Sequence, residues 1–215
     1  MARGVPAIAY HQLFERHLFE WSPGNLLVEP LMTDTRSVKL RAVELGDLTF
    51  TRRCRNDPAI HLPALGRRFP ITEVGEEAWF RALGQGSPPS EVTYIVVDCD
   101  HEVPVGLTTL RDIDWINRTA RFGLWIAPEA QGRGVGTAAT AQTVDVAFGR
   151  LNLRKLALDV LASNDRAIAM YRGLGFIEEG RFADEVYSDG AYHDVVRMAL
   201  TGAQSKPFQI SNGEG

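Results

Sequence analysis

The sequence predicts an α/β domain of the α+β kind, in which helices flank a mixed, mostly antiparallel sheet. Strand patterns follow one another closely between residues 92 and 126, which favours an antiparallel meander. A glycine-rich loop at 131–137 then joins the last of these strands to a helical pattern. The mostly apolar run at 155–161 is typical of a central strand, parallel to the strand before the loop.

The residues before the meander predict one strand and two helices. Apolar and polar side chains alternate over 37–43, as they do in a half-buried strand. Asp47 is expected to cap a short helix that runs through Cys54. Thr72 is expected to cap a longer helix that runs through Leu83.

The meander and the residues after it supply the remaining elements, placed by apolar periodicity and by turn residues. We expect strands at 92–97, 105–111 and 119–126, helices at 138–149 and 166–172, a strand that begins at Phe176, and a last pair of strands at 184–187 and 192–200. Residues 188–191 have the composition of a hairpin turn between that last pair.

The chain is expected to have three parts: an N-terminal extension at 1–37, the domain at 38–202 and a flexible tail at 203–215. Apolar residues recur at roughly helical spacing over 8–21 in the extension. A helix that covers the core of its own domain and a contact within an oligomer explain this pattern equally well.

Length and composition are ordinary for a soluble protein. The chain has 215 residues, of which 45% are hydrophobic and 23% charged, and its net charge is −4. This charge argues against nucleic-acid binding. No apolar stretch is long enough to cross a membrane, and no secretory signal is expected. Cys54 and Cys99 lack metal or redox spacing, so we expect reduced thiols, no metal and a cytoplasmic protein.

The loop at 131–137 has the properties of a phosphate-binding turn. Its glycines let the backbone turn sharply and approach a ligand, because they carry no Cβ. The helix that follows offers unpaired N–H groups to an anion, and Arg133 adds a fixed positive charge. The glycine spacing of a Rossmann fingerprint and the Gly-Lys-Ser/Thr end of a P-loop are both absent. A tight strand-to-helix turn without a ligand is the alternative.

Two motifs resemble those of the GNAT acetyltransferases. Gln131, Gly134 and Gly136 fill the pattern Gln/Arg-x-x-Gly-x-Gly/Ala of that family's coenzyme A loop. The segment from Asn164 to Phe176 is similar to the family's N-x-x-A-x-x-x-Y-x-x-x-G-F signature. The resemblance covers about residues 38–200 and implies the three-layer GNAT fold. Within the superfamily the chain resembles the ribosomal-protein N-terminal and spermidine acetyltransferases, and amino-sugar acetyltransferases share much of the pattern.

The resemblance implies acetyl-CoA as the co-substrate. The backbone of Leu124, Trp125 and Ile126 would bind the pantetheine arm by extending the strand edge. The residues that would hold the pyrophosphate are Gln131, Gly132, Arg133, Gly134, Val135, Gly136 and Thr137. Asn164 would bind the cofactor arm, with Ala167 and Arg172 alongside it. A helix cap is an equally weighted role for Asn164, and the two roles are compatible.

The resemblance also assigns chemistry to Tyr171. When a neutral amine attacks the thioester directly, the departing thiolate has a conjugate-acid pKa near ~8.5 if it behaves like cysteine. A phenol, whose ordinary pKa is about 10, can protonate that sulfur. Spacing alone would favour a core tyrosine on an apolar helix face, and the resemblance reverses that preference.

The sequence does not identify the general base. Arg121 stands where spermidine acetyltransferases have Glu, which counts against a polyamine acceptor and against a carboxylate base on that strand. The weak candidates for the base, each of which reads more simply as a turn or edge residue, are Asp112, Asp114, Glu185 and His193. Candidates for an acceptor pocket, which packing or a solvated surface explains as well, are Trp79, Trp115, Tyr192 and the arginines at 52–55 and 67–68.

The favoured function is therefore an acetyl-CoA-dependent N-acetyltransferase that acts by direct attack in a ternary complex. Its acceptor would be a small amine, an amino sugar or a protein N-terminus. A non-catalytic CoA-binding subunit and a nucleotide-binding module are the alternatives. The expected partners are the amine and a second copy of the chain, with a dimer as the expected form, and neither nucleic acid nor membrane.

Overall fold

The computed structural model describes residues 37–61, 65, 69–188 and 190–203. The chain divides into two units, Met1–Met32 and Thr33–Gly215, and the described residues all belong to the second unit. The predicted helix at 8–21 and nearly all of the predicted tail lie outside the described residues. The division into an extension, a domain and a tail stays a prediction.

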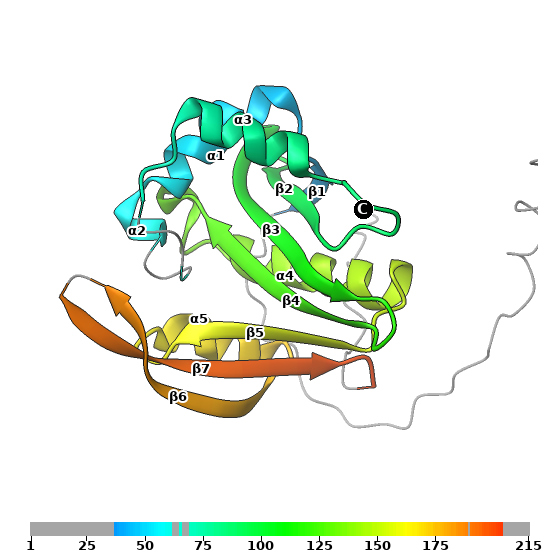
Figure 1. Cartoon of the computed structure of the whole chain (residues 1–215), viewed down its shortest axis with the longest axis vertical. Coiled ribbons are helices and arrows are strands. Elements are labelled where there is room, and N and C mark those ends of the chain that lie inside the picture. The colour runs from blue at the N-terminus through cyan, green and yellow to red at the C-terminus, as the bar shows by residue number, and fades with distance from the viewer. Residues whose placement is uncertain (1–36, 62–64, 66–68, 189, 204–215) are drawn as a thin grey trace, which may run out of the picture. The chain divides into compact units, whose positions relative to one another are not determined.

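The centre of the second unit is a seven-stranded sheet with the order β1-β2-β3-β4-β5-β7-β6 (Figure 1). Its strands are β1 (Val38–Ala42), β2 (Val92–Asp98), β3 (Val103–Asp114), β4 (Thr119–Ile126), β5 (Lys155–Leu161), β6 (Ile177–Ser188) and β7 (Ala191–Thr201). The first four strands form the predicted antiparallel meander. β5 pairs with β4 in parallel, as expected, and β7 pairs antiparallel with both β5 and β6.

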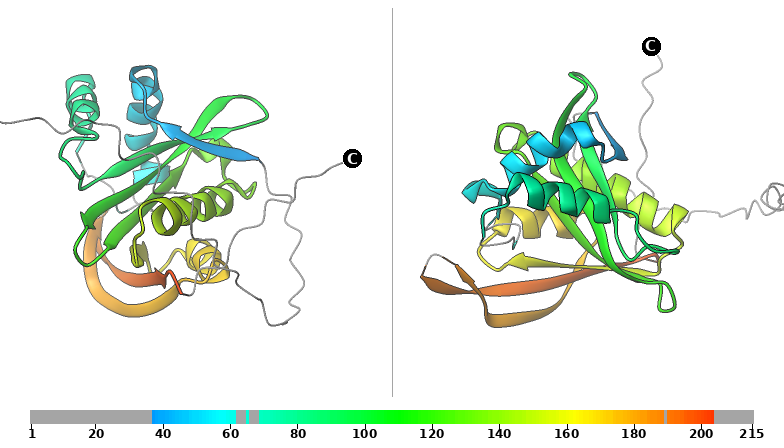
Figure 2. Two further views of the ribbon diagram at one scale, coloured as in Figure 1. Left: turned by 90° about the vertical axis from the view of Figure 1, so that its right-hand side faces the viewer. Right: turned by 45° about the horizontal axis from the view of Figure 1, so that its top comes forward.

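Helices cover both faces of this sheet. They are α1 (Leu48–Arg55), α2 (Pro58–His61), α3 (Glu73–Ala82), α4 (Val135–Asp145) and α5 (Asp165–Gly173), with a short 3-10 turn at Leu45–Asp47, another at Pro128–Ala130 and a π-type turn at Val146–Arg150. α1 and α3 lie on one side of the β1–β4 half, and α4 and α5 lie on the other (Figure 2). The mixed sheet and its two helical layers confirm the predicted three-layer arrangement.

Local sequence explains most element boundaries. Thr72 caps α3 as predicted, because its Oγ1 accepts the backbone N–H of Gly75 at 3.1 Å. The expected cap at Asp47 is wrong, since its side chain makes no capping hydrogen bond to α1. That carboxylate is instead paired with Arg41 and accepts the backbone N–H of Glu44.

α4 begins three residues earlier than the predicted 138–149 range, at Val135. Gly134 occupies its N-cap position with φ 76°, a left-handed conformation that costs glycine little and that lets the chain turn directly from the loop into the helix. The hydroxyls of Thr140 and Thr143 donate hydrogen bonds to backbone carbonyls of their own helix. Small buried side chains on α4 let it approach β1, β3 and β4 closely.

The sheet opens between β4 and β5. The ladder between these strands holds three residue pairs, the last of which is Arg121 with Ala157. From Phe122 onward, the edge of β4 that faces β5 has no strand partner among the described residues. Beyond the gap, β5 continues to pair with β7 as far as Leu161. This opening separates the β1–β4 half from the β5–β7 half and creates space within the sheet.

A main core cluster of buried side chains holds the two halves together below the opening. Leu110 from β3, Leu156 and Leu158 from β5, and Met198 and Leu200 from β7 are all at most 2% exposed. Burial of such side chains is the main favourable contribution to folding. None of the helices in the described part of the chain has the length and apolar character that a membrane crossing requires.

Candidate active site

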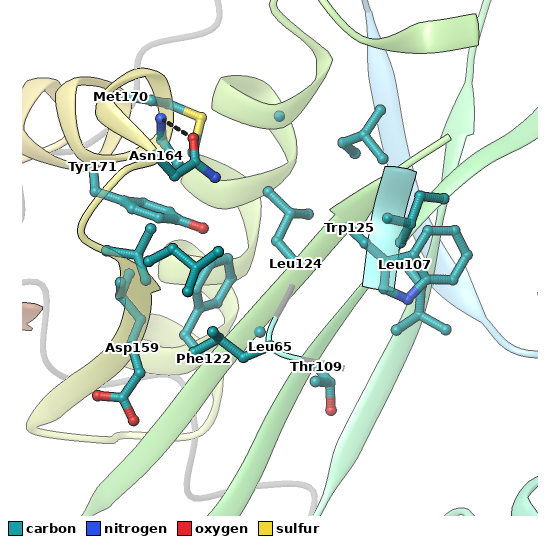
Figure 3. A pocket seen from close by; sticks show the side chains of 18 of the residues that line it. Leu65, Leu107, Thr109, Phe122, Leu124, Trp125, Asp159, Asn164, Met170 and Tyr171 are labelled. Atoms are coloured by element: carbon teal, nitrogen blue, oxygen red, sulfur yellow. Dashed lines mark hydrogen bonds between the residues drawn. The ribbon is translucent and has the colours of Figure 1, made fainter. Parts of the chain in front are cut away.

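A cavity of about 780 Å³ occupies the opening between β4 and β5. Its walls come from the meander strands, the glycine loop, the N-terminus of α4, β5, α5 and the α1–α3 segment. In the close view, Tyr171 and Asn164 lie on one side of the cavity and Trp125 and Thr109 on the other (Figure 3). The side chain of Leu124 lies between them (Figure 3). The cavity therefore connects the α4–α5 side of the sheet with the α1–α3 side.

The glycine loop forms one end of this cavity. Gly132 and Gly134 have φ values of 83° and 76°, which side chains with a Cβ rarely adopt. The loop delivers the N-terminus of α4 to the cavity wall, where the first N–H groups of a helix lack partners within the helix. The side chain of Gln131 fastens the loop to the end of β4, because its Nε2 donates to the carbonyl of Ile126 at 2.9 Å.

Arg166 lies beside this loop and was not predicted. A Cβ placed on Gly132 would lie 3.6 Å from Arg166 Nη2, so the guanidinium extends across the glycine backbone. Arg166 lines the cavity from the first turn of α5, next to helix N-terminal N–H groups of α4. Both features favour an anion. The sequence signal was its place two residues after Asn164, within the second motif.

The predicted residues of β4 lie along the unpaired edge. Leu124, Trp125 and Ile126 all line the cavity. Their other edge is paired with β3, where they lie opposite Thr108, Leu107 and Gly106. The edge that faces the opening can therefore extend the sheet with the amides of an elongated ligand.

Asn164 and Ala167 begin α5 at the opposite wall. Asn164 Oδ1 accepts the backbone N–H of Ala167 at 3.1 Å, which confirms the helix-cap role. The side-chain nitrogen points away from the helix toward the cavity (Figure 3). The cap fixes the amide, so its nitrogen is held ready to donate to a ligand.

Tyr171 lies one turn further along α5 and its hydroxyl points into the cavity (Figure 3). Its ring packs against Phe122 and Phe176, with centroid distances of 6.1 and 5.6 Å. Burial raises the pKa of the Tyr171 phenol above its usual range. The phenol therefore keeps its proton at neutral and moderately alkaline pH.

Several predicted residues lie away from the cavity lining. Arg133 is exposed, and Arg172 is exposed and forms an ion pair with Glu178 at 3.2 Å. The side chain of Val135 is buried in the core, so only its backbone is available to a ligand. The candidate bases outside the lining are Asp112, Asp114, Glu185 and His193. The aromatic candidates outside it are Trp115 and Tyr192, whereas Trp79 does line the cavity.

Two cavity carboxylates were missed by sequence reasoning. Glu91 precedes β2, and its Oε1 accepts the hydroxyl of Thr93 at 2.9 Å and that of Thr109 at 3.5 Å. Asp159 on β5 accepts from two guanidiniums: Arg121 Nη1 donates to its Oδ2 at 2.5 Å and Arg197 Nε to its Oδ1 at 2.9 Å. No motif marks either residue, since strand register alone brings these partners together.

Comparisons with known proteins relate the chain to a family and to solved structures. A family model described as the acetyltransferase (GNAT) domain matches residues 37–177. The spermidine N(1)-acetyltransferase of Vibrio cholerae is 33% identical over 75% of this chain and 91% of its own length. That of Escherichia coli K12 is 32% identical over 79% of this chain and 88% of its own length.

Solved structures of the Vibrio cholerae enzyme share the fold. The crystal structure of its complex with CoA and spermine matches with a TM-score of 0.73 and 31% identity, covering 78% of this chain and 96% of that one. A dodecameric structure of the same enzyme matches with a TM-score of 0.68 and 31% identity, covering 77% of this chain and 94% of that one.

Proposed function

We propose that acetyl transfer takes place in the cavity between β4 and β5. The chain belongs to the GNAT acetyltransferase family and is an acetyl-CoA-dependent N-acetyltransferase. The observation that carries this proposal is the joint lining of one cavity by the glycine loop, the unpaired edge of β4 and Tyr171. Amine and thioester would be bound together, one from each side of the sheet.

The residues at the α4–α5 side fit acetyl-CoA. The loop from Gly132 to Thr137 and the guanidinium of Arg166 offer N–H donors and positive charge to the pyrophosphate. The free edge from Leu124 to Ile126 offers backbone groups to the pantetheine amides. The Asn164 amide nitrogen would donate to the same arm. Neither the Arg133 nor the Arg172 side chain lines the cavity, so the roles predicted for them stay predictions.

Tyr171 would act as the general acid. Bound acetyl-CoA supplies the activated acetyl group and the sulfur on which it leaves. As the new N–C bond forms and the C–S bond breaks, the Tyr171 hydroxyl would give its proton to that sulfur. The nitrogen would release its extra proton to solvent, and the phenolate would recover a proton from solvent. Its raised pKa keeps the donor protonated under working conditions.

Glu91 is the proton acceptor that the cavity supports best. An alkylammonium with a pKa near ~10 must lose a proton before it can attack. Glu91 accepts only hydroxyl hydrogen bonds among the described residues, whereas both oxygens of Asp159 are taken up by Arg121 and Arg197. Glu91 would therefore take the ammonium proton, directly or through water, and pass it to solvent.

The acceptor is proposed to be the primary amine of a small molecule. Spermidine, the acceptor named for the relatives, is one candidate. The Arg121 position counts against it, because an arginine, here paired with Asp159, stands where spermidine acetyltransferases are expected to have a glutamate that could attract a polycation. Amino sugars and amino acids are the other small-molecule candidates.

Self-association is proposed to involve the β6–β7 hairpin, with the predicted dimer as the smallest assembly. Tyr187 and Tyr192 pair near its tip with centroids 5.1 Å apart, and both are substantially exposed, as are Ile177 and Phe182. An exposed aromatic pair such as Tyr187 and Tyr192 favours a contact surface at the tip of the hairpin. Light scattering on the full chain and on Tyr192→Glu tests this, since a hairpin contact predicts a smaller assembly for the variant. A cytoplasmic location also stays a prediction.

CoA-thiol release from acetyl-CoA against a panel of amines tests the proposed function. The panel holds polyamines, amino acids, amino sugars and N-terminal peptides, and acetyl-CoA binding is measured in parallel by calorimetry. We expect tight binding together with amine-dependent release. Binding without release to any amine would contradict the proposed reaction.

A further inference from the structure

Arg111 lines the acceptor side of the cavity and belongs to a row of arginines on the same face of the sheet. Arg111 on β3 lies directly opposite Arg121 on β4. Side chains of directly opposed residues share one face of a sheet, and like charges there are destabilising. Arg197 on β7 lies opposite Asp159 on β5 and is joined to Arg121 through that carboxylate. The three guanidiniums therefore share the face that carries Thr109 and Trp125, at alternate positions of β3 and β4.

Most charges that line the cavity are already paired. The charged lining residues in the described part of the chain are Arg55, Glu91, Arg111, Asp159 and Arg166. Arg55 is paired with buried Glu76 at 2.9 Å, and Asp159 is held by two guanidiniums. Arg166 belongs to the glycine-loop end. Glu91 and Arg111 remain as the acceptor-side charges that form no ion pair with a described residue.

Ion pairs offset most of the charges on this face. Asp159 is paired with Arg121 and Arg197, and Glu185 and Glu179 add negative charge near Arg197, whereas Arg111 lines the cavity without an ion pair among the described residues. Arg111 is exposed on its strand, so its guanidinium is open to solvent and to a ligand. A polycation would bring a positive charge against Arg111, whereas an amine with one anionic group would meet Glu91 and Arg111 with complementary charges.

We propose that this site selects a small primary amine that also bears an anionic group, a carboxylate or a phosphate, which Arg111 binds. The arginine fork matches the planar oxygens of either group. Arg121 and Arg197 are offset by the Asp159 carboxylate that they hold, so Arg111 is the acceptor-side guanidinium that is left to bind the anionic group. The inference rests on the proposed function and names its substrate class, which differs from the polyamine of the named relatives.

The test measures kcat/KM by CoA-thiol release for pairs of amines that differ in one anionic group. Methionine is compared with methioninamide, glucosamine 6-phosphate with glucosamine, and spermidine serves as the polycation. We expect the anionic member of at least one pair to be preferred by about tenfold or more, the size of a charge-assisted hydrogen bond. The pair that shows the preference separates a carboxylate from a phosphate.

Substitutions of Arg111 test whether this residue causes the preference for an anionic group. Arg111→Gln should reduce it by about tenfold while leaving the KM for acetyl-CoA unchanged, and Arg111→Lys should keep part of it. Arg150→Gln, an exposed arginine beyond α4 and outside the cavity, is the matched control and should change nothing. Arg111→Glu should improve the use of spermidine.

Each result decides between the two proposals. Equal kcat/KM for both members of each amine pair would overturn the anionic acceptor and leave the transferase function intact. A preference that survives in Arg111→Gln would do the same. Absence of release with every amine, despite acetyl-CoA binding, would overturn both.

Discussion

Phe122 and Tyr171 meet edge to face across the opening in the sheet, with ring planes at 86° and centroids 6.1 Å apart. Phe122 belongs to β4 and Tyr171 to α5, so this pair joins the two walls of the cavity. No described residue hydrogen-bonds to the Tyr171 hydroxyl. The phenol is therefore oriented by ring packing alone, which leaves its proton for a bound ligand.

Replacement of Tyr171 by Phe should lower kcat by about 10²-fold or more, because the general acid is lost. The ring and its packing against Phe122 remain, so the affinity for acetyl-CoA and the thermal stability should change little. Steady-state kinetics with the best amine, together with calorimetric titration of acetyl-CoA, would measure the two effects.

Tyr192→Phe is the matched control, because the same hydroxyl is removed from a residue that is 63% exposed and outside the cavity. The pH profile gives a further check. A raised phenol pKa means that kcat of the wild type should not fall through loss of this proton below pH ~10. Turnover of Tyr171→Phe close to that of the wild type would remove the phenol from the mechanism.

Gly106→Ala should weaken acetyl-CoA binding. A Cβ at this position would lie 2.6 Å from the carbonyl oxygen of Trp125 and 2.7 Å from Ile126 Cδ1, so β4 would have to move away from β3. Those two residues belong to the edge proposed to bind pantetheine. We expect a several-fold rise in the KM for acetyl-CoA and a loss of about 1–3 kcal/mol in stability.

The control for that substitution is Gly149→Ala, because a Cβ on Gly149 would meet no atom within 4 Å. An acetyl-CoA KM in Gly106→Ala equal to that of the control would show that the close approach of β3 and β4 does not shape the cofactor site.

Apolar periodicity and turn residues predicted those helices and strands whose bounds depend on residues close in the sequence. The strands at 119–126 and 155–161 have the expected bounds, because an apolar strand between turn residues is readable from sequence alone. The glycine loop and Tyr171 were found because their spacing forms motifs. Residues of the loop and Tyr171 line one cavity.

Features that depend on long-range register were not predictable. Arg121, Asp159 and Arg197 lie on three strands and meet only once those strands pair. The same limit explains the error at Asp47, since the local pattern cannot show that Arg41 offers a bidentate partner in place of a helix N-terminus.

Asp47 makes a pH-dependent contribution to stability. Burial alone would raise the pKa of Asp47, but hydrogen bonds from Arg41 and from the backbone of Glu44 hold it below its usual range. A lowered carboxyl pKa in the folded state stabilises the fold above the unfolded value of ~3.9, and this contribution is lost as the pH falls through the folded value.

Asp47→Asn should therefore cost about 1–2 kcal/mol at pH 7 and progressively less toward pH 3, as urea unfolding at both values would show. The comparison is Glu102→Gln, which breaks the exposed pair with Lys39 and should cost less than about 1 kcal/mol. An equal cost of Asp47→Asn at both pH values would contradict the assignment.

Cys54 should be inert to thiol reagents in the folded protein. It is 1% exposed, and burial raises its pKa to about 11, so the reactive thiolate is scarce at pH 8. Cys99 is partly exposed, and both cysteines are free. Titration with a colorimetric disulfide reagent should label Cys99 in native protein and both thiols in urea. Cys99→Ser should give no fast native reaction and one thiol in urea. Fast labelling of that variant under native conditions would mean that the α1 packing around Cys54, against Ile60 and Ala127, opens readily.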